Sequence, residues 1–234
     1  MYKNKTFLAI IPARAGSKRL PNKNILDLAG KPMIVWTIEA AKASKYIDTI
    51  VVTSDSSTIL KIANELSVDI VERPEVLASD TASTFDVVQH AVGHLKKRFD
   101  YIILLQPTSP LRSEKHIDEA IELLIKKNAN AIISVCKTSH TPNWSNTLPK
   151  NGSLANFLNS ESVNKRSQDY DEFYRLNGAI YICKIESLLK NKSLFLRESI
   201  FAYIMNRKSS IDIDESIDLD LCKCYLGCKP NDFN

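Results

Sequence analysis

The chain has 234 residues, which corresponds to one or two domains at about 150 residues each. Hydrophobic residues make up 44% and charged residues 25%, so a wholly disordered or fibrous chain is excluded. The net charge of +4 is too small to indicate nucleic-acid binding, and no run approaches the roughly 18 apolar residues of a membrane span. With no leader-like pattern at the start, we expect a soluble, cytoplasmic protein without a nucleic-acid or membrane partner.

Short apolar runs alternate with helical patterns from residue 7 to about 138. In chain order, the predicted elements are a strand at 7–11, a helix at 32–41, a strand at 49–53, a helix at 57–66, a strand at 68–71, a helix near 83–98, a strand at 101–105, a helix at 113–128 and a strand at 131–135. Near-continuous apolar strands separated by helices predict a doubly wound α/β domain with a mostly parallel sheet. Ligands in such a domain bind beyond the carboxyl ends of the strands.

Residues 139–176 interrupt this alternation. The segment is rich in Ser, Asn, Pro, Lys and Asp, and it carries the isolated aromatic residues Trp144, Phe157, Tyr170, Phe173 and Tyr174. An irregular segment of this length is unusual inside a compact domain, and packing on a partner subunit would explain its aromatic residues. Regular structure resumes with strands at 178–182 and 200–204 and a helix from about 216. We therefore predict a core of residues 1–138 and 177–234 with residues 139–176 inserted in it.

The loop after the first strand has the composition of a phosphate-binding loop. Gly16 permits a tight turn, backbone N–H groups can face an oxyanion, and Arg14, Lys18 and Lys23 supply positive charge. The loop matches neither the Walker A pattern nor G-x-G-x-x-G, which excludes a P-loop ATPase and a Rossmann dehydrogenase. A basic surface loop is the alternative, but the position directly after the first strand favours phosphate binding.

A second charged feature lies near the other end of the chain. Residues 1–31 hold seven basic residues and one acid, whereas residues 211–220 hold five acids and no base. Asp212 and Asp214 are two residues apart, so on an extended segment both carboxylates point to one side and can bind Mg²⁺. The alternatives are two solvated surfaces and, for the two aspartates, a helix N-cap.

Cysteine and histidine residues give weaker signals. Five cysteines in a cytoplasmic chain argue against a disulfide framework. Cys222, Cys224 and Cys228 lack a fourth ligand nearby, so we expect thiols rather than a zinc site. His90 and His94 share a helical face but have no Glu between them, and we expect ordinary surface histidines.

Six segments in matching order resemble motifs of the acylneuraminate cytidylyltransferases. They are residues 11–24 (IPARAGSKRLPNKN), 52–55 (VTSD), 73–83 (RPEVLASDTAS), 104–112 (LLQPTSPLR), 174–181 (YRLNGAIY) and 210–214 (SIDID). The resemblance implies a Rossmann-like nucleotidyltransferase fold with a protruding dimerisation arm. It also implies transfer of CMP from CTP to the anomeric hydroxyl of a nine-carbon 2-keto acid sugar, with release of pyrophosphate.

The resemblance also implies a set of site residues. Those that hold the triphosphate are Arg14, Lys23 and, beside them, Ser17; Asn24 lies near sugar and phosphate; and Arg73 with the Ala78–Ser83 stretch reads cytosine. The acid sugar is contacted by Gln106, with Arg175, Asn177 and Arg166 as further candidates. Asp212 and Asp214 correspond to the family's ligands for Mg²⁺ or Mn²⁺, and Asp214 or a metal-bound water helps to deprotonate the attacking hydroxyl.

Family members use the region of residues 139–176 as an arm that crosses into the partner subunit. The resemblance therefore implies a homodimer with composite active sites, in which Arg166 binds the sugar carboxylate of the neighbouring site. Trp144 departs from the pattern, because some members carry a lysine there.

Two alternative functions stay open. The 3-deoxy-manno-octulosonate cytidylyltransferases share the N-terminal motif but read LPGKP where this chain has LPNKN at residues 20–24. A non-catalytic nucleotide-binding protein on the same fold is the second alternative, because a fold alone does not determine activity. The motifs fit N-acetylneuraminate, legionaminate and pseudaminate equally well.

Overall fold

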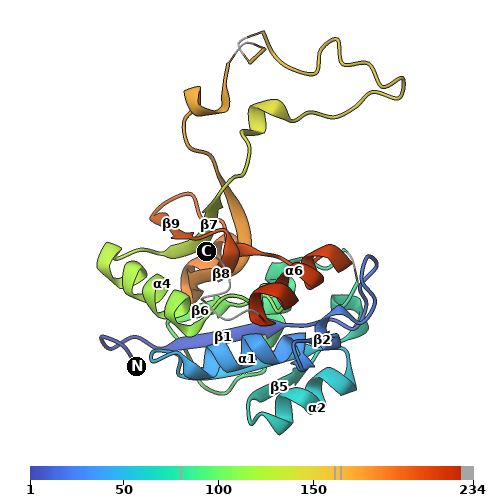
Figure 1. Ribbon diagram of the computed structural model, residues 1–234. Helices are drawn as coiled ribbons and strands as arrows, with labels where there is room; N and C mark the ends of the chain where they lie inside the picture. The colour runs from blue at the N-terminus through green and yellow to red at the C-terminus, as the bar shows by residue number, and fades with distance from the viewer. Residues whose placement is uncertain (80, 161, 164, 228–234) are drawn as a thin grey trace.

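The centre of the computed structural model, which describes residues 1–79, 81–160, 162–163 and 165–227, is a seven-stranded sheet (Figure 1). In sheet order, the strands are β5 (Asp69–Glu72), β4 (Thr49–Ser54), β1 (Phe7–Pro12), β6 (Tyr101–Leu104), β8 (Tyr174–Lys184), β7 (Ala131–Lys137) and β9 (Ile200–Met205). Every pairing is parallel except those of β8, which runs antiparallel to both β6 and β7. The predicted mostly parallel sheet is confirmed.

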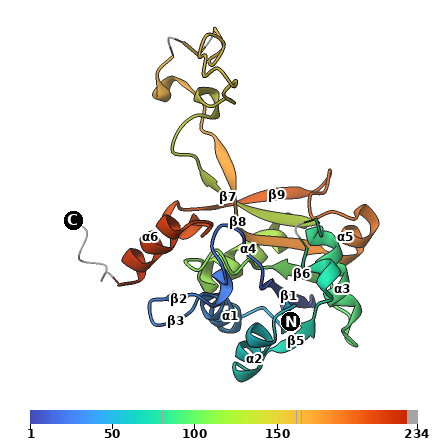
Figure 2. The same cartoon turned by 90° about the vertical axis from the view of Figure 1, so that its right-hand side faces the viewer.

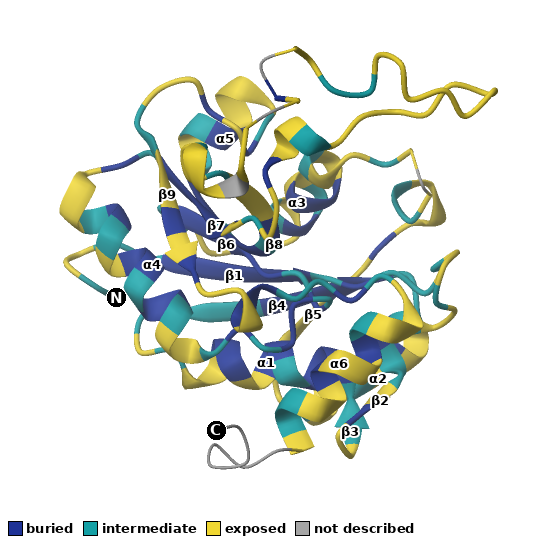
Figure 3. Ribbon diagram, turned by 45° about the horizontal axis from the view of Figure 1, so that its top comes forward, coloured by how far each residue is buried: buried dark blue, intermediate teal, exposed yellow. Residues whose placement is uncertain are grey.

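Helices cover both faces of the sheet. Alternate side chains of β1 enter two separate cores, because successive residues of a strand point to opposite faces. Phe7, Ala9 and Ile11 pack with α1 (Met33–Ala43), α2 (Ser57–Glu65) and α4 (Glu114–Lys127). Leu8 and Ile10 pack with α3 (Thr84–Gly93) and α5 (Ile185–Asn191). Figure 3 shows the resulting column of buried residues along the central strands, as expected for a doubly wound fold.

The structure differs from the predicted elements at a few places. Helix α3 ends at Gly93 rather than near residue 98, because the charged run 96–98 offers no apolar side chain to hold a further turn against the sheet. Strand β8 begins at Tyr174 instead of residue 178, and the short helix α5 was not predicted. A small hairpin of β2 (Asp27–Leu28) and β3 (Lys31–Pro32) was also missed, since two-residue strands leave no periodicity to detect.

The segment between β7 and β8 projects away from the sheet (Figures 1 and 2). Its base is closed by Thr138, whose backbone N–H donates to the carbonyl oxygen of Phe173 at 2.9 Å. Farther out, the rings of Trp144 and Tyr170 pack edge to face with centroids 6.2 Å apart. The segment has little regular structure beyond two short 3₁₀ turns, at Pro142–Trp144 and Ser167–Asp169.

Helix α6 (Ser216–Gly227) packs on the β2–β3 hairpin through a third, smaller apolar cluster. Ile213 is fully buried in this cluster beside Leu28 and Met33. In α6, Cys222 is buried and Cys224 exposed, whereas Cys228 lies outside the described residues. The described chain contains no helix long and apolar enough to cross a membrane.

A bulge interrupts the pairing of β7 with β8 between Ile133 and Val135. The Ser134 hydroxyl fills it: its Oγ accepts a hydrogen bond from the backbone N–H of Ile180 at 2.8 Å and lies 2.6 Å from Oδ1 of Asn177. The Asn177 amide in turn donates to Ser210 Oγ at 2.9 Å. The backbone groups at the bulge lack their usual partners on the neighbouring strand, and water does not reach them because the site is buried. The side chains of Ser134 and Asn177 supply the missing hydrogen bonds.

This network generates a stability prediction. Asn177→Ala should lower the free energy of unfolding by about 2 to 3 kcal/mol, because it removes the buried hydrogen bonds from Ser134 and from the Ala179 N–H and the one to Ser210. Asn191→Ala, at an exposed amide that bonds only to its own helix, should stay within about 0.5 kcal/mol of wild type. Urea denaturation of both variants measures the difference. Equal stability of the two variants would contradict a structural role for Asn177.

Candidate active site

A pocket of about 410 Å³ lies beyond the carboxyl ends of β1 and β6. Its walls come from the loop after β1, the segment after β5, the loop after β6 and the segment before α6. Eight of the residues predicted from the sequence line it together: Arg14, Ser17, Lys23, Asn24, Arg73, Gln106, Asp212 and Asp214. The fold thus brings both charged ends of the chain to one pocket.

The loop after β1 is held by contacts to its own backbone and to β4. Asn24, which is buried, donates from Nδ2 to the carbonyl oxygen of Arg14 at 2.9 Å. The backbone N–H of Ala15 donates to Oδ1 of Asp55 at 3.0 Å. These bonds fix the turn, so its remaining backbone and its basic side chains can face an anion without reorganisation.

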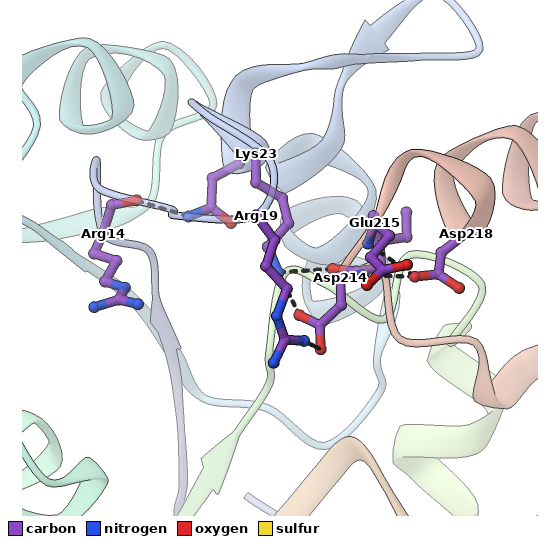
Figure 4. Close-up of polar contacts among 8 residues, drawn as sticks. Arg14, Arg19, Lys23, Asp214, Glu215 and Asp218 are labelled. Carbon is purple, nitrogen blue, oxygen red and sulfur yellow. Dashed lines mark hydrogen bonds and ion pairs between the residues drawn. The ribbon is translucent and has the colours of Figure 1, made fainter. Parts of the chain in front are cut away.

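Lys23 links this loop to the acidic segment (Figure 4). Its Nζ donates to the carbonyl oxygen of Ile213 at 2.7 Å and to Oδ1 of Asp214 at 2.9 Å. Arg19 Nη1 donates to the other carboxylate oxygen of Asp214 at 3.0 Å. The hydrogen bond from Lys23 holds the pKa of Asp214 below its usual range. The two acids do not serve the N-cap role considered from the sequence. Instead, Asp218 accepts the backbone N–H groups of residues 214 and 215.

Asp212 has a different environment from Asp214. Burial raises its pKa above the usual value, partly offset by a hydrogen bond from the Thr108 hydroxyl. Its Oδ1 is buried and has no hydrogen-bond partner in the described part of the chain. A buried carboxylate oxygen of this kind fits a divalent cation. The described residues form no cluster of three or more His, Cys, Asp or Glu side chains, but Mg²⁺ needs only one or two carboxylates when phosphates supply further ligands.

The wall opposite the acidic segment contains Arg73. Its side chain is buried, and its Nη2 lies 3.6 Å from Oδ1 of Asp55. Burial lowers the pKa of Arg73, and Asp55 opposes this shift. Among the described residues, its buried Nε and Nη2 have no hydrogen-bond partner, although Nη2 forms an ion pair with Asp55. Arg73 also lines the pocket, where it adds positive charge to the wall.

Ala78 and Ser83 lie at the margin of the pocket rather than in its wall. Their neighbours Leu77, Ser79, Ala82 and Thr84 line it instead. The Ser83 hydroxyl caps α3 by accepting the backbone N–H of Asp86 at 3.1 Å, and Ser83 lines a smaller adjoining pocket of about 260 Å³. Contacts from this segment would therefore come mostly from residues next to those two.

Three residues predicted for the sugar side do not line the pocket. Arg175 lies behind the acidic segment, where its Nη2 donates to the carbonyl oxygen of Ser210 at 3.2 Å. Asn177 is buried in the bulge network described above. Arg166 lies on the projecting segment and forms an ion pair with Asp169 at 3.1 Å. The structure thus separates these residues from the eight that it brings together.

Three residues that shape the site were not among those predicted from the sequence. Asp55 bonds both the β1 loop and Arg73, Thr108 bonds Asp212, and Arg112 is fully buried beneath the loop after β6. All three stand in segments whose resemblance was noted, 52–55 and 104–112. The motifs that contain these residues were recognised in the sequence, but the role of each residue depends on contacts between distant parts of the chain.

Comparisons with known proteins agree with this geometry. The family model described as cytidylyltransferase matches residues 8–224. An N-acylneuraminate cytidylyltransferase of Escherichia coli is 39% identical over 215 residues, covering 92% of this chain and 50% of that protein. A CMP-N,N'-diacetyllegionaminic acid synthase of Legionella pneumophila is 36% identical over 215 residues, covering 90% of this chain and 92% of that protein. This chain spans about half the length of the E. coli relative.

A solved structure supports the fold independently. A CMP:2-keto-3-deoxy-manno-octonic acid synthetase complexed with CTP superposes with a TM-score of 0.73, covering 95% of this chain and 98% of that chain at 17% identity. The match of the family model to almost the whole chain, together with a basic loop and an acidic pair in one pocket, establishes the relationship. The chain belongs to the cytidylyltransferase family.

Proposed function

We propose that the protein transfers CMP from CTP to the anomeric hydroxyl of a nine-carbon 2-keto acid sugar and releases pyrophosphate. One observation carries the proposal: Lys23 and Asp214, from opposite ends of the chain, meet in a pocket of a cytidylyltransferase. The names of the E. coli and Legionella relatives support a nonulosonate as acceptor. A 3-deoxy-manno-octulosonate acceptor has weaker support, because the likeness to that synthetase is one of fold at 17% identity.

The residues of the pocket suggest a division of labour for in-line attack on the α-phosphorus. Arg14, Lys23 and the loop backbone bind the triphosphate, and Arg73 with the adjacent segment 77–84 binds cytosine. Phosphoryl transfer depends on charge neutralisation and positioning more than on covalent catalysis. A Mg²⁺ or Mn²⁺ ion held by Asp212 and Asp214 would neutralise phosphate charge. Asp214, or a water bound to that cation, would assist deprotonation of the acceptor hydroxyl.

The acceptor side of the pocket is less basic than the nucleotide side. Gln106 lines the wall there, Arg175 lies behind the acidic segment, and neither forms part of a dense cationic cluster. Such a set suits one carboxylate and several hydroxyls better than the two negative charges of a sugar phosphate. We therefore propose a keto acid rather than a sugar 1-phosphate as acceptor.

We further propose that two chains form a homodimer through the projecting segment. Exposed apolar residues, including Leu148, Leu154 and Val163, lie along it with no core of their own. Arg166 lies on this segment, away from its own pocket, so it would complete the acceptor site of the partner. Trp144 packs on Tyr170 within the segment, which supports a structural role for this residue.

A substrate panel tests the proposed reaction. The protein is incubated with CTP, Mg²⁺ and, separately, N-acetylneuraminate, legionaminate, pseudaminate, 3-deoxy-manno-octulosonate, glucose 1-phosphate or mannose 1-phosphate. We expect pyrophosphate release and a CMP-sugar product with at least one nonulosonate and none with the hexose phosphates. Turnover confined to a hexose phosphate would overturn the proposed acceptor, and turnover with none would favour a non-catalytic nucleotide-binding protein.

The metal assignment predicts a loss of activity on chelation. Excess EDTA should abolish turnover, and Asp212→Ala should lower kcat by about 100-fold or more, because the buried carboxylate can no longer bind the cation. CTP binding should weaken but stay measurable, since the basic loop is intact. Asp220→Ala, at an exposed acid of the same run, is the control and should retain normal activity. Full turnover in EDTA would contradict the assignment.

Composite sites predict complementation between inactive subunits. Lys23→Ala and Arg166→Ala chains, refolded or co-expressed together, should regain about a quarter of wild-type activity, because half of the random dimers carry one intact site. A mixture of Lys23→Ala with Asp212→Ala is the control. Lys23 and Asp212 line the same pocket of one chain, so each chain of a mixed dimer has a defective pocket and no activity should return. Failure of the first mixture, or an active monomer in light scattering, would contradict the dimer proposal.

A further inference from the structure

The side chain of Gln106 lies directly against the backbone of Gly178. Gln106 follows β6 and Gly178 lies in the neighbouring strand β8, opposite the bulged part of β7. A Cβ atom built on Gly178 would come within 2.8 Å of Gln106 Oε1 and 3.4 Å of Asp212 Oδ2. The space that a side chain would fill at position 178 is therefore taken by the Gln106 amide, next to the buried carboxylate of Asp212.

Two properties of position 178 act separately. Its φ of +74° is a conformation that residues with a side chain rarely adopt, so any substitution there costs conformational energy. The close contact is a different effect, because Gln106 Oε1 is the end of a flexible side chain that can rotate away. A methyl group at 178 should therefore displace the amide without disrupting the fold.

Arg112 fixes the backbones on either side of this contact. Its Nη1 lies 3.2 Å from the carbonyl oxygen of Gln106 and 3.1 Å from that of Ala179, the residue after Gly178. The guanidinium is fully buried, and its burial lowers the pKa to about 9. Because one nitrogen contacts the loop after β6 and the middle of β8, Arg112 holds these two backbones at a fixed spacing and so limits the space available to the amide.

We propose that Gly178 is a positioning residue for the acceptor sugar: its missing side chain lets Gln106 extend beside Asp212, and Arg112 holds the loop after β6 and strand β8 at that spacing. This proposal rests on the proposed function, in which Gln106 contacts the sugar. A substitution at position 178 should therefore weaken binding of the acceptor and leave binding of CTP unchanged. The three atoms nearest to the space a Cβ would occupy belong to Gln106 and Asp212, and none of them belongs to Arg14 or Arg73 on the nucleotide side of the pocket.

The test compares Gly178→Ala with Gly30→Ala. Gly30 has a similarly positive φ of +89°, but a Cβ there would meet nothing within 4 Å, so this control carries the backbone strain without the contact. For Gly178→Ala we expect an acceptor KM raised by about tenfold or more, with the Kd for CTP unchanged. Gly30→Ala should lower Tm while leaving the acceptor KM at the wild-type value.

A double-mutant cycle shows whether the effect passes through Gln106. In a Gln106→Ala background, Gly178→Ala should raise the acceptor KM no further, because the displaced amide is already absent. An additive effect, or equal weakening of CTP and sugar, would overturn the proposal. If Gly178→Ala does not fold, the acceptor KM and the Kd for CTP are measured on Arg112→Lys instead. Its single ammonium cannot hold both carbonyl groups as the guanidinium does, so it should raise the acceptor KM and leave the Kd for CTP unchanged.

Turnover by the wild-type protein distinguishes a failure of the positioning role of Gly178 from a failure of the proposed function. Wild-type turnover with a nonulosonate, combined with a normal acceptor KM in Gly178→Ala, would overturn the positioning role and leave the proposed function intact. A wild-type protein inactive on every nonulosonate would overturn the proposed function and, with it, the role of Gly178.

Discussion

The ion pair between Lys23 and Asp214 joins two segments that are 191 residues apart in the chain. One segment is the basic loop after β1 and the other is the acidic segment before α6, and each needs a counter-charge in the pocket. They neutralise each other in part through this ion pair, because opposite charges at 2.9 Å attract strongly where solvent is partly excluded. A triphosphate with its cation would supply both counter-charges. We therefore propose that the pocket binds an anion and a cation together rather than either alone.

Apolar packing places this charged pair. Ile213 stands between the two aspartates and is buried with Leu28 and Met33, so Asp212 and Asp214 are held on the side that faces the pocket. The two carboxylates nevertheless differ: one is buried beneath the loop after β6, and the other is kept ionised by cations from the loop after β1. Strand β8 links this arrangement to the projecting segment, because it contains Gly178 and begins where that segment ends.

The sequence was sufficient to predict the features that repeat along the chain or stand in short motifs. Apolar runs such as Phe7–Ile11 predicted the buried strands, and the basic composition of the loop after β1 predicted its place in the pocket. It did not predict which residues would share a contact. Asn177 was expected to bind sugar, yet it satisfies the bulge at Ser134, because a break in strand pairing depends on a partner strand that periodicity does not reveal. The roles of Asp55 and Gly178 were missed for the same reason.

We propose that the ion pair between Lys23 and Asp214 opens when the nucleotide and its cation bind. A crystal structure of the protein with CTP and Mg²⁺ tests this most directly. We expect Lys23 Nζ to leave Asp214 for a phosphate oxygen, Asp212 and Asp214 to ligate the cation, and Arg73 to contact the base. A complex in which the triphosphate lies outside this pocket, with the Lys23–Asp214 ion pair intact, would contradict it.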